Sequence, residues 1–338
     1  MNAAAVTSAA GALDVAGTAG QPSSLFSSKE WLEVITATYG FEAQALCVGH
    51  SALLFSVVQD LRQQRLVSFP FSDYCDPLLA DPSDWPELLD GLVAAGVPVH
   101  LRVLHARLPD DERFHVRPAG LWHAADLTSD PDHMWSSLPS AARQNVRRAE
   151  RDGISIRVGT TIDDVELFHA MHRGLRRRRY KILAQPRLFF QLLYDTFVER
   201  GRGFVLLAES AGEPVAGLFL IESGGTLYYK FNASTERGSR PNDLLAWHAM
   251  TEGHERGLQT LDFGFSDLDQ PGLHRFKRKF ADREETIMAA THTPPDWNGD
   301  AGAAGTALLG RITDLFVDPL VPDTLAARAG DVMYRYFC

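Results

Sequence analysis

The stretch at residues 213–234, EPVAGLFLIESGGTLYYKFNAS, has the pattern of two β-strands joined by a tight turn. Aliphatic, β-branched and aromatic residues dominate both halves, as in strands of a half-buried sheet. The Gly224-Gly225 pair between them supplies the positive backbone torsions that a two-residue hairpin needs. The segment FVLLAES at 204–210, followed by Gly212-Glu213, adds another strand before it. We therefore predict a meander of three antiparallel strands.

Helical and extended segments alternate on both sides of this meander. In the second half of the chain, helices are expected at 139–153, 161–179, 187–201 and 239–257, and strands at 154–159 and 260–266, with a return strand ending near 288. The first half repeats the order weakly, with helices at 24–40 and 82–96 and strands at 41–49, 52–61, 65–71 and 97–104. The pattern predicts a duplicated α/β domain.

Length and composition limit the organisation of the chain. The 338 residues with 45% hydrophobic content suit two folded domains. Residues 1–24 lack the basic and apolar regions of a signal peptide, which indicates a disordered tail. No run reaches the roughly 18 apolar residues of a membrane span, so a cytoplasmic protein is expected. We expect domains at 25–134 and 135–290, then a Pro/Gly/Ala-rich linker with C-terminal helices at 291–338.

Cysteine usage and charge exclude several classes of function. Cys47, Cys75 and Cys338 are far apart, so neither a disulfide framework nor a cysteine zinc site is indicated. The net charge is −10, yet residues 141–283 carry 23 Lys and Arg against 18 Asp and Glu. This asymmetry indicates an anionic ligand at the basic middle and argues against a DNA-binding protein.

An ordered series of motifs then resembles a known family. The segments RQNVRRAERDGISIRV (143–158), LRRRRYKILAQPRLFF (175–190), RPNDLLAWHAMTEGHERGLQTLDFG (240–264) and GLHRFKRKF (272–280) follow one another with family-like gaps. They resemble the FemAB-like acyltransferases, over about residues 135–285. LVSFPFSDYCDPLL at 66–79 looks like the amino-terminal half of bacterial members. The resemblance implies an α/β (α+β) fold of tandem GNAT-like domains, each a mixed, mainly antiparallel sheet flanked by helices.

The resemblance also implies a reaction, in which an acyl or aminoacyl group is transferred to an amine. Fem-type members take an amino acid from aminoacyl-tRNA, so the expected partners are an amine-bearing small molecule or peptide acceptor and tRNA. The donor would be a cosubstrate, aminoacyl-tRNA or acyl-CoA, with no tightly bound cofactor. Two alternatives stay open: an acetyl-CoA-dependent N-acetyltransferase, and a non-catalytic GNAT-fold module that binds an anionic ligand. The oligomeric state is not indicated.

One motif departs from the pattern of CoA-using relatives. Their Arg/Gln-x-x-Gly-x-Gly/Ala loop holds the CoA pyrophosphate at a helix N-terminus. The corresponding turn here, STERGSRPNDLL at 234–245, has Gly238 but no second glycine. Arg237 and Arg240 precede the Pro241 helix, where they either hold a phosphate or carboxylate or are exposed turn residues.

Strand periodicity suggests which side chains line a groove. In TLYYKFNAS, Tyr228, Lys230 and Asn232 alternate with Tyr229 and Phe231. Because burying a lysine is costly, we expect the set containing Lys230 to face a groove or solvent.

Polar and apolar side chains alternate in the next strand. In LDFGFSD, Asp262 and Ser266 share a face, and Asp262 is either a structural acceptor or a base, with Asp267 as its rival.

Two cationic segments complete the candidate site. The resemblance singles out Phe276-Lys277 as the meeting point of donor and acceptor, where Lys277 holds a phosphate or a developing oxyanion. Arg278 and Lys279 are expected to be solvated or to face RNA. The four arginines at 176–179 cover all sides of a helix, so one of them, Arg178 or Arg179, is expected to contact a ligand.

The sequence therefore predicts a metal-free site, since His169 and His172 share a helix face but lack a third ligand nearby. The predicted catalytic residues are Lys277, Asp262 and Tyr228, and the predicted substrate-binding residues are Phe276, Lys230, Asn232, Arg178, Arg179, Arg237, Arg240, Ser266 and Asp267.

Overall fold

The structure is a computed structural model that describes residues 5–16, 24–108, 110–235 and 240–338. The chain divides into two compact units. Unit 1 contains Met1–Gly120, Glu285–Arg311 and Arg335–Cys338, and unit 2 contains Leu121–Glu284 and Ile312–Tyr334. The first boundary therefore lies earlier than the one predicted at 134, and the chain returns to unit 1 after Glu284.

Unit 1 is an α/β unit whose sheet has the strand order β1-β2-β3-β4-β5-β12. Neighbouring strands are antiparallel except for the parallel pair β4 and β5. Its elements are β1 (Ala5–Ser8), α1 (Ala9–Ala16), η2 (Leu25–Ser27), α2 (Lys29–Tyr39), β2 (Glu42–Val48), β3 (Ser51–Asp60), β4 (Gln63–Val67), η3 (Pro82–Asp84), α3 (Trp85–Val93), β5 (Val99–Val103) and β12 (Arg283–His292).

Unit 2 has the strand order β6-β11-β10-β9-β8-β7. Its strands β7, β8, β9 and β10 are antiparallel neighbours, whereas β10 and β11 are parallel. Its elements are β6 (His115–Asp126), α4 (Pro131–Ser137), α5 (Ser140–Arg151), β7 (Ile154–Gly159), α6 (Ile162–Leu175), η4 (Arg176–Tyr180), α7 (Arg187–Leu193), η5 (Tyr194–Val198), β8 (Gly203–Ser210), β9 (Glu213–Ser223), β10 (Thr226–Ser234), α8 (Pro241–Glu255), β11 (Thr260–Asp267), α9 (Pro271–Lys277) and α11 (Asp323–Met333). Strands β6 and β12 run past the unit bounds, since β6 begins before Gly120 and β12 begins before Glu284. Helices α10 (Asp300–Val317) and η6 (Tyr334–Phe337) also cross the boundary along the chain.

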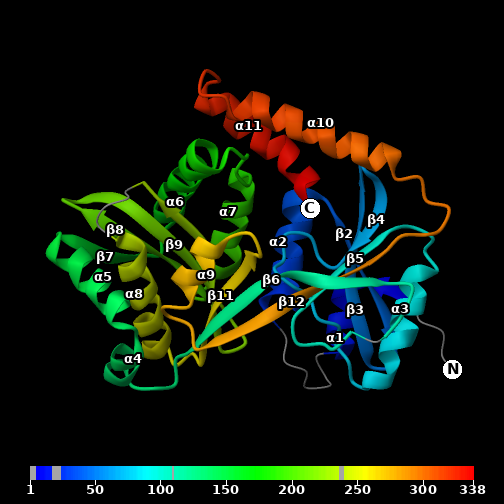
Figure 1. Cartoon of the computed structure of the whole chain (residues 1–338), viewed down its shortest axis with the longest axis horizontal. Coiled ribbons are helices and arrows are strands. Elements are labelled where there is room, and N and C mark those ends of the chain that lie inside the picture. Colours follow the sequence, from blue (N-terminus) through cyan, green and yellow to red (C-terminus); the bar gives the residue numbers. More distant parts are fainter. Residues whose placement is uncertain (1–4, 17–23, 109, 236–239) are drawn as a thin grey trace. The chain divides into compact units, whose positions relative to one another are not determined.

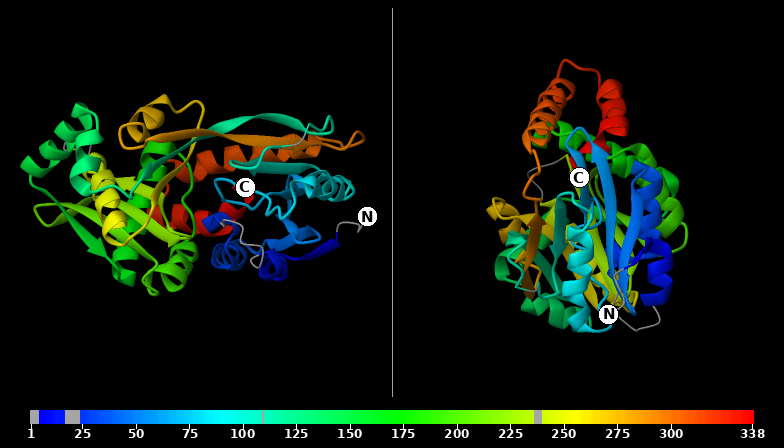
Figure 2. Two further views of the ribbon diagram at one scale, coloured as in Figure 1. Left: turned by 90° about the horizontal axis from the view of Figure 1, so that it is seen from below. Right: turned by 90° about the vertical axis from the view of Figure 1, so that its right-hand side faces the viewer.

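The two units repeat one topology, as the sequence predicts. In unit 1, the antiparallel strands β2-β3-β4 are followed by α3 and by β5, which is parallel to β4. In unit 2, β8-β9-β10 are followed by α8 and by β11, which is parallel to β10. Figure 1 shows β8 and β9 of this meander side by side, and Figure 2 gives two further views of the same sheet. The prediction of two α/β domains with mainly antiparallel sheets is therefore confirmed.

Three local predictions are wrong. Residues 5–16 form β1 and α1 instead of a disordered tail, because β1 pairs with β2 through main-chain hydrogen bonds that need no apolar pattern. The return strand, β12, lies mainly in unit 1, where it pairs with β5, rather than wholly in the second half. Strand β6 was not predicted, since Pro118 and Gly120 interrupt its pattern. The other residues of the predicted tail lie outside the described residues.

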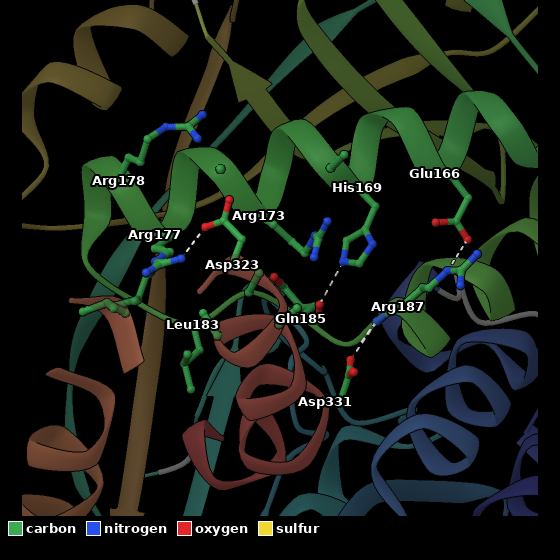
Figure 3. Close-up of a pocket in the computed structure, with 17 residues that line it drawn as sticks. Glu166, His169, Arg173, Arg177, Arg178, Leu183, Gln185, Arg187, Asp323 and Asp331 are labelled. Carbon is green, nitrogen blue, oxygen red and sulfur yellow. Dashed lines mark hydrogen bonds and ion pairs between the residues drawn. The ribbon is translucent and has the colours of Figure 1, made fainter. Parts of the chain in front are cut away.

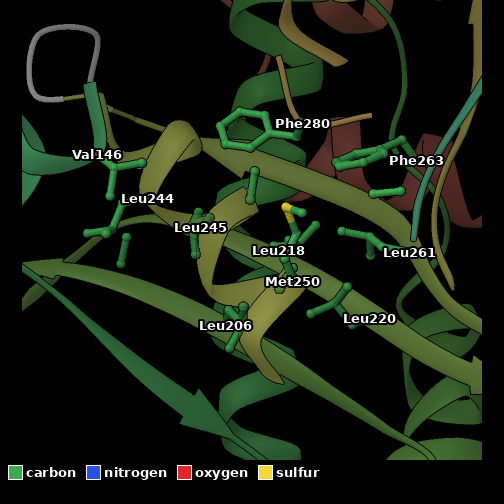
Figure 4. Packing of buried hydrophobic residues seen from close by; sticks show 14 of the residues in the cluster. Val146, Leu206, Leu218, Leu220, Leu244, Leu245, Met250, Leu261, Phe263 and Phe280 are labelled. Carbon is green, nitrogen blue, oxygen red and sulfur yellow. The ribbon is translucent and has the colours of Figure 1, made fainter. Parts of the chain in front are cut away.

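Helices cover both faces of the unit 2 sheet. Leu218 of β9 packs in a buried cluster with α5 and α8, which Figure 4 shows from close by together with Leu244 and Phe263. The neighbouring Phe219 points to the opposite face, where it meets Phe190 of α7. The alternation along β9 therefore supports two separate cores, one on each face.

The second core is aromatic and centred on Phe190. Its ring centroid lies 5.9 Å from Phe168, 6.0 Å from Phe219 and 5.4 Å from Phe231. Because β9 carries Gly217 rather than a larger residue, Phe168 packs directly on the strand: a Cβ at position 217 would lie 2.9 Å from its ring. α6 and α7 are thereby held against the sheet.

Among the described residues, no helix is both long and apolar enough to cross a membrane.

In unit 1, the carboxylate of Asp60 is buried between arginines, and its side chain is 2% exposed. Arg65 donates two hydrogen bonds of 2.9 Å to its carboxylate, and Arg62 donates further ones from its side chain and backbone. Burial alone would raise the pKa of Asp60, but these hydrogen bonds outweigh burial and lower the pKa well below its usual value.

Replacing Phe190 by Ala should destabilise unit 2 by about 4 kcal/mol, because it leaves a cavity at the centre of the aromatic core. Native-state hydrogen exchange of the β8–β10 amides measures the effect. Leu188→Ala on the same helix is the control, since Leu188 is 46% exposed and should cost less than about 1 kcal/mol. Equal effects of the two substitutions would contradict this account of the core.

Replacing Asp60 by Asn should destabilise unit 1 by about 3 kcal/mol at neutral pH, because two arginines lose a buried partner. The folded pKa lies below the unfolded one, so the carboxylate stabilises unit 1 above about pH 4 and its contribution is lost as the pH falls. Urea unfolding between pH 3 and pH 7 tests both points. Asp90→Asn is the control, because Asp90 forms an exposed ion pair with Arg113 and its replacement should change the free energy of unfolding little. A D60N protein that loses as much stability between pH 7 and pH 3 as the wild type would disprove the role of Asp60.

Candidate functional site

The parallel strands β10 and β11 separate partway along their length. Within the described residues, their pairing covers Thr226–Tyr228 and Thr260–Asp262, although β10 continues to Ser234 and β11 to Asp267. Backbone groups beyond this point are not used for a ladder between the two strands. Most residues predicted to act on substrate lie along or next to these diverging halves.

A β-bulge at Lys230 changes the face on which the β10 side chains lie. Tyr229 pairs with Leu220 and Phe231 with Phe219, so Lys230 is an extra residue in the strand. Tyr229 therefore packs against Phe263 on the α8 side, whereas Phe231 packs against Phe190 on the α6 side. The prediction that Tyr229 and Phe231 share one face is wrong because the extra residue breaks the two-residue period.

The bulge also separates the three residues predicted to share the groove face. Tyr228 is buried in the sheet. Asn232 faces α8, where its Nδ2 donates to Asn242 Oδ1 at 3.2 Å and to Gly217 O at 3.3 Å. Lys230 is half-buried, with Nζ 5.8 Å from the centroid of the Phe231 ring. Of the three, Lys230 and Asn232 remain accessible at the divergence.

Strand β11 bends at Gly264, and Asp262 holds the bend. Gly264 has φ +68°, a conformation that favours glycine, and its N–H donates to Asp262 Oδ1 at 2.6 Å. The Asp262 side chain is buried. Of the two readings left open by the sequence, this contact is the structural one: the carboxylate accepts a hydrogen bond from the strand itself.

Lys277 of α9 is buried beside this bend. Its Nζ donates to Gly264 O at 2.8 Å and to Phe265 O at 3.0 Å. A lysine that is 3% exposed is uncommon and costs free energy unless its ammonium group is bound. The two carbonyls bind it, and they fix its positive charge at the bend, where β11 has separated from β10.

An acidic group lies at the first turn of α8. Asp243 is buried, forms an ion pair with Lys279, and accepts a 3.0 Å hydrogen bond from Asn145 Nδ2. The Lys279 ammonium also lies 4.8 Å from the centre of the Phe276 ring. Lys279, expected to be solvated or to face RNA, is thus bound within the protein. Sequence reasoning missed Asp243, although an acidic residue in a first helical turn is a usual signal.

Two polar residues at the end of β11, Ser266 and Asp267, differ in accessibility. Ser266 is buried, and its Oγ has no hydrogen-bond partner within the described residues. Asp267 is exposed at the end of β11 and accepts from Gln270 Nε2 at 3.2 Å.

Burial raises the pKa of Tyr229 well above its usual value, and the Asp243 carboxylate raises it further, so the phenol stays protonated.

His123 of β6 is a second residue that sequence reasoning missed. It is fully buried, with Nε2 2.7 Å from Glu284 Oε2. Burial lowers the pKa of His123 and the charge of Lys277 lowers it further, so the ring is neutral at pH 7. Hydrogen bonds from Arg278 hold the pKa of Glu284 at about 2. No signal could have identified His123, because its strand was not predicted.

The arginines before α8 are only partly described. Arg240 is exposed at the N-cap of α8, with φ 61° and ψ 37°, a left-handed conformation that is unusual for a residue other than glycine. Arg237 lies outside the described residues. The expected anion-binding role of the pair therefore stays a prediction.

The arginine-rich segment lies at a different place in unit 2. Arg178 lines a cavity of about 400 Å³ between α6–η4 and α11 (Figure 3). Arg179 is exposed, with its guanidinium 5.5 Å from the centroid of the Tyr180 ring. None of the predicted residues of β10, β11 or α9 lines this cavity. The predicted site residues thus form two groups rather than one.

The two histidines of α6 are packing residues. Both are buried, and each donates from Nε2 to Gln185: His169 to its backbone carbonyl at 3.2 Å, and His172 to its side-chain Oε1 at 2.7 Å. Burial lowers the pKa of His169, and it lowers that of His172 to about 3. In the part of the chain that the structure describes, no group of three His, Cys, Asp or Glu could hold a metal ion.

One segment of unit 2 matches a known protein family. Residues 137–278 match the family model described as "Acetyltransferase (GNAT) domain". The matched segment runs from the start of α5 to the end of α9, and so includes β10, β11, Asp243 and Lys277. No curated protein sequence matches the chain.

Solved structures extend the comparison to nearly the whole fold. FemX is similar with a TM-score of 0.59 at 14% identity, covering 91% of this chain and 98% of FemX. The C-terminal domain of a putative lysylphosphatidylglycerol synthetase from Agrobacterium fabrum has a TM-score of 0.57 at 15% identity, covering 89% and 98%. The L-PGS structure from Bacillus licheniformis has 0.54 at 14% identity, covering 86% and 98%. At these identities the comparison shows a common fold.

The motif series, the topology of unit 2 and the matched domain agree on one assignment. Residues 137–278 form a GNAT acetyltransferase domain, and nearly the whole chain shares the fold of FemX.

Proposed function

We propose that the chain transfers an aminoacyl group to an amine acceptor at the point where β10 and β11 separate. The observation that carries this proposal is the buried Lys277 ammonium, fixed by Gly264 O and Phe265 O at the bend of β11. An amine that attacks an ester or thioester needs alignment, loss of a proton and stabilisation of the developing oxyanion. A fixed positive charge in a water-poor place serves the last need.

The residues of the divergence divide this work. Lys277 stabilises the oxyanion, and the backbone of β10 and β11 beyond their pairing aligns the donor and acceptor. Phe276 and Lys230 contact the substrate at its rim. Asp262 is a positioning residue, because its carboxylate holds the bend that places the Gly264 carbonyl against Lys277.

The first turn of α8 favours an aminoacyl donor over acyl-CoA. A helix N-terminus that holds a pyrophosphate offers backbone N–H groups and a positive partial charge. Here the buried Asp243 carboxylate is in that first turn and is bound by Lys279 and Asn145. A second anion would be repelled by it, and the preceding turn lacks the second glycine of the CoA-binding pattern.

The names of similar structures support this choice of donor. FemX and the lysylphosphatidylglycerol synthetases share the fold of this chain. The second candidate, an acetyl-CoA-dependent N-acetyltransferase, is favoured by the description of the matched family model. The two candidates differ in the donor, so donor tests separate them.

Lys277→Met should lower the rate of transfer about 100-fold or more, because it removes the charge that stabilises the oxyanion. Transfer from aminoacyl-tRNA to a panel of amines and amino-terminated peptides provides the assay. Arg275→Met is the matched control, since Arg275 is exposed on the same helix and should leave the rate unchanged. A K277M protein that is folded and fully active would refute the role of Lys277.

Acetyl-CoA should not stabilise the wild-type protein against thermal unfolding, because the Asp243 carboxylate repels its pyrophosphate. Asp243→Asn removes that charge and frees Lys279, so acetyl-CoA should then raise the melting temperature. Asp163→Asn, in the first turn of α6, is the control and should show no gain. Tight binding of acetyl-CoA by the wild type, with acetyl transfer, would replace the first candidate by the second.

A further inference from the structure

The cavity in unit 2 is bounded by elements that hydrogen bonds hold in place. It lies between one face of α6–η4 and helix α11, with the loop 182–185 at its base (Figure 3). Its volume of about 400 Å³ is within the range of small-molecule sites. The transfer site proposed above does not include it.

Contacts at both ends of α11 keep this cavity open. At the first turn of α11, Arg177 pairs with Asp323. Arg177 also donates to the carbonyl of Asp318, in the segment just before α11. At the last turn, the Arg187 N–H donates to Asp331 Oδ1 at 3.2 Å. Gly330 allows the helix to approach the loop, since a Cβ there would lie 2.6 Å from Ala184 O. Between these two ends, the cavity separates α11 from α6–η4.

The middle of the cavity contains cationic groups without anionic partners. Arg177 pairs with Asp323, and Arg187 pairs with Glu166. Within the described residues, neither Arg173 nor Arg178 forms an ion pair, and the buried Nε of Arg173 has no hydrogen-bond partner. Figure 3 shows Arg173 beside His169, toward Gln185. A buried guanidinium nitrogen left without an acceptor is costly, so an acceptor is missing there.

The balance of charge around the cavity favours one negative charge. Four arginines line it, Arg173, Arg177, Arg178 and Arg187, against three carboxylates, Glu166, Asp323 and Asp331. His169, which burial keeps neutral, adds no charge. A single anionic group would therefore neutralise the lining.

Apart from Gly174 and the polar Gln185, the remaining lining is apolar and belongs mainly to the loop and the C-terminal helices. It consists of Ile182, Leu183, Ala184, Val317, Ala326 and Ala327, together with Ala170 of α6. Apolar walls of this kind bury a hydrocarbon part of a ligand, and the polar groups orient it.

We propose that this cavity binds an amphipathic monocarboxylate, with its carboxylate accepting hydrogen bonds from Arg173 and its hydrocarbon part against Leu183, Val317 and Ala327. The planar guanidinium group matches a carboxylate through paired hydrogen bonds. This proposal is independent of the transfer reaction, since it concerns other residues and a different measurement.

Isothermal titration of the full chain with octanoate tests the proposal, with acetate and octanol as the probes that each lack one half of the ligand. Octanoate should bind, and acetate and octanol should bind at least about tenfold more weakly, because each loses either the apolar contacts or the charged hydrogen bonds. Octanol or acetate binding as tightly as octanoate would overturn the proposal, as would an absence of octanoate binding.

Two variants locate the site. Arg173→Met should weaken octanoate binding at least about tenfold, while the control Arg200→Met, at an exposed arginine of unit 2, should not. Ala327→Phe fills the apolar half from α11 and should abolish binding without lowering the melting temperature. Retention of wild-type affinity by either R173M or A327F would show that the cavity is not the binding site.

Discussion

The geometry of unit 2 depends on one extra residue in β10. The bulge at Lys230 lets Tyr229 pack toward α8 and Phe231 toward α6, so that one strand contributes an aromatic ring to the core on each face. A bulge bends its strand and increases the local twist. The pairing of β10 with β11 ends at Tyr228, just before this bulge. The divergence of the two strands therefore begins next to the bulge.

Charges inside unit 2 are placed by backbone groups and by one another. Lys277 is held by carbonyls that are available because β11 bends at Gly264, and Asp262 maintains the bend. Asp243 is held by Lys279 and Asn145 at the start of α8. The region therefore holds a cation at the bend of β11 and, at the start of α8, an anion paired with Lys279.

Much of the secondary structure could be predicted from periodicity and turn residues. The strand at 154–159 and the meander at 204–234 lie where the sequence predicts them, because the pattern of a strand and the glycines of a hairpin are local features. The strands β1 and β6 could not be predicted, since the first is stabilised by pairing with β2 and the second contains Pro118 and Gly120. Their formation depends on partners distant in sequence.

For the site, the sequence by itself determined that unit 2 is an α/β domain with a basic segment. It identified Asp262 as unusual in an apolar strand and the β10 residues by alternation, whereas Lys277 was identified through the family resemblance. Only the tertiary structure decided which of them meet. Because of the bulge, the side chains of Asn232 and Tyr228 lie in different surroundings. Tertiary packing buries Lys277, and Lys279 forms an ion pair with Asp243. The physical reason is that alternation within a strand is a short-range property, whereas burial and ion pairing are decided by segments brought together in folding.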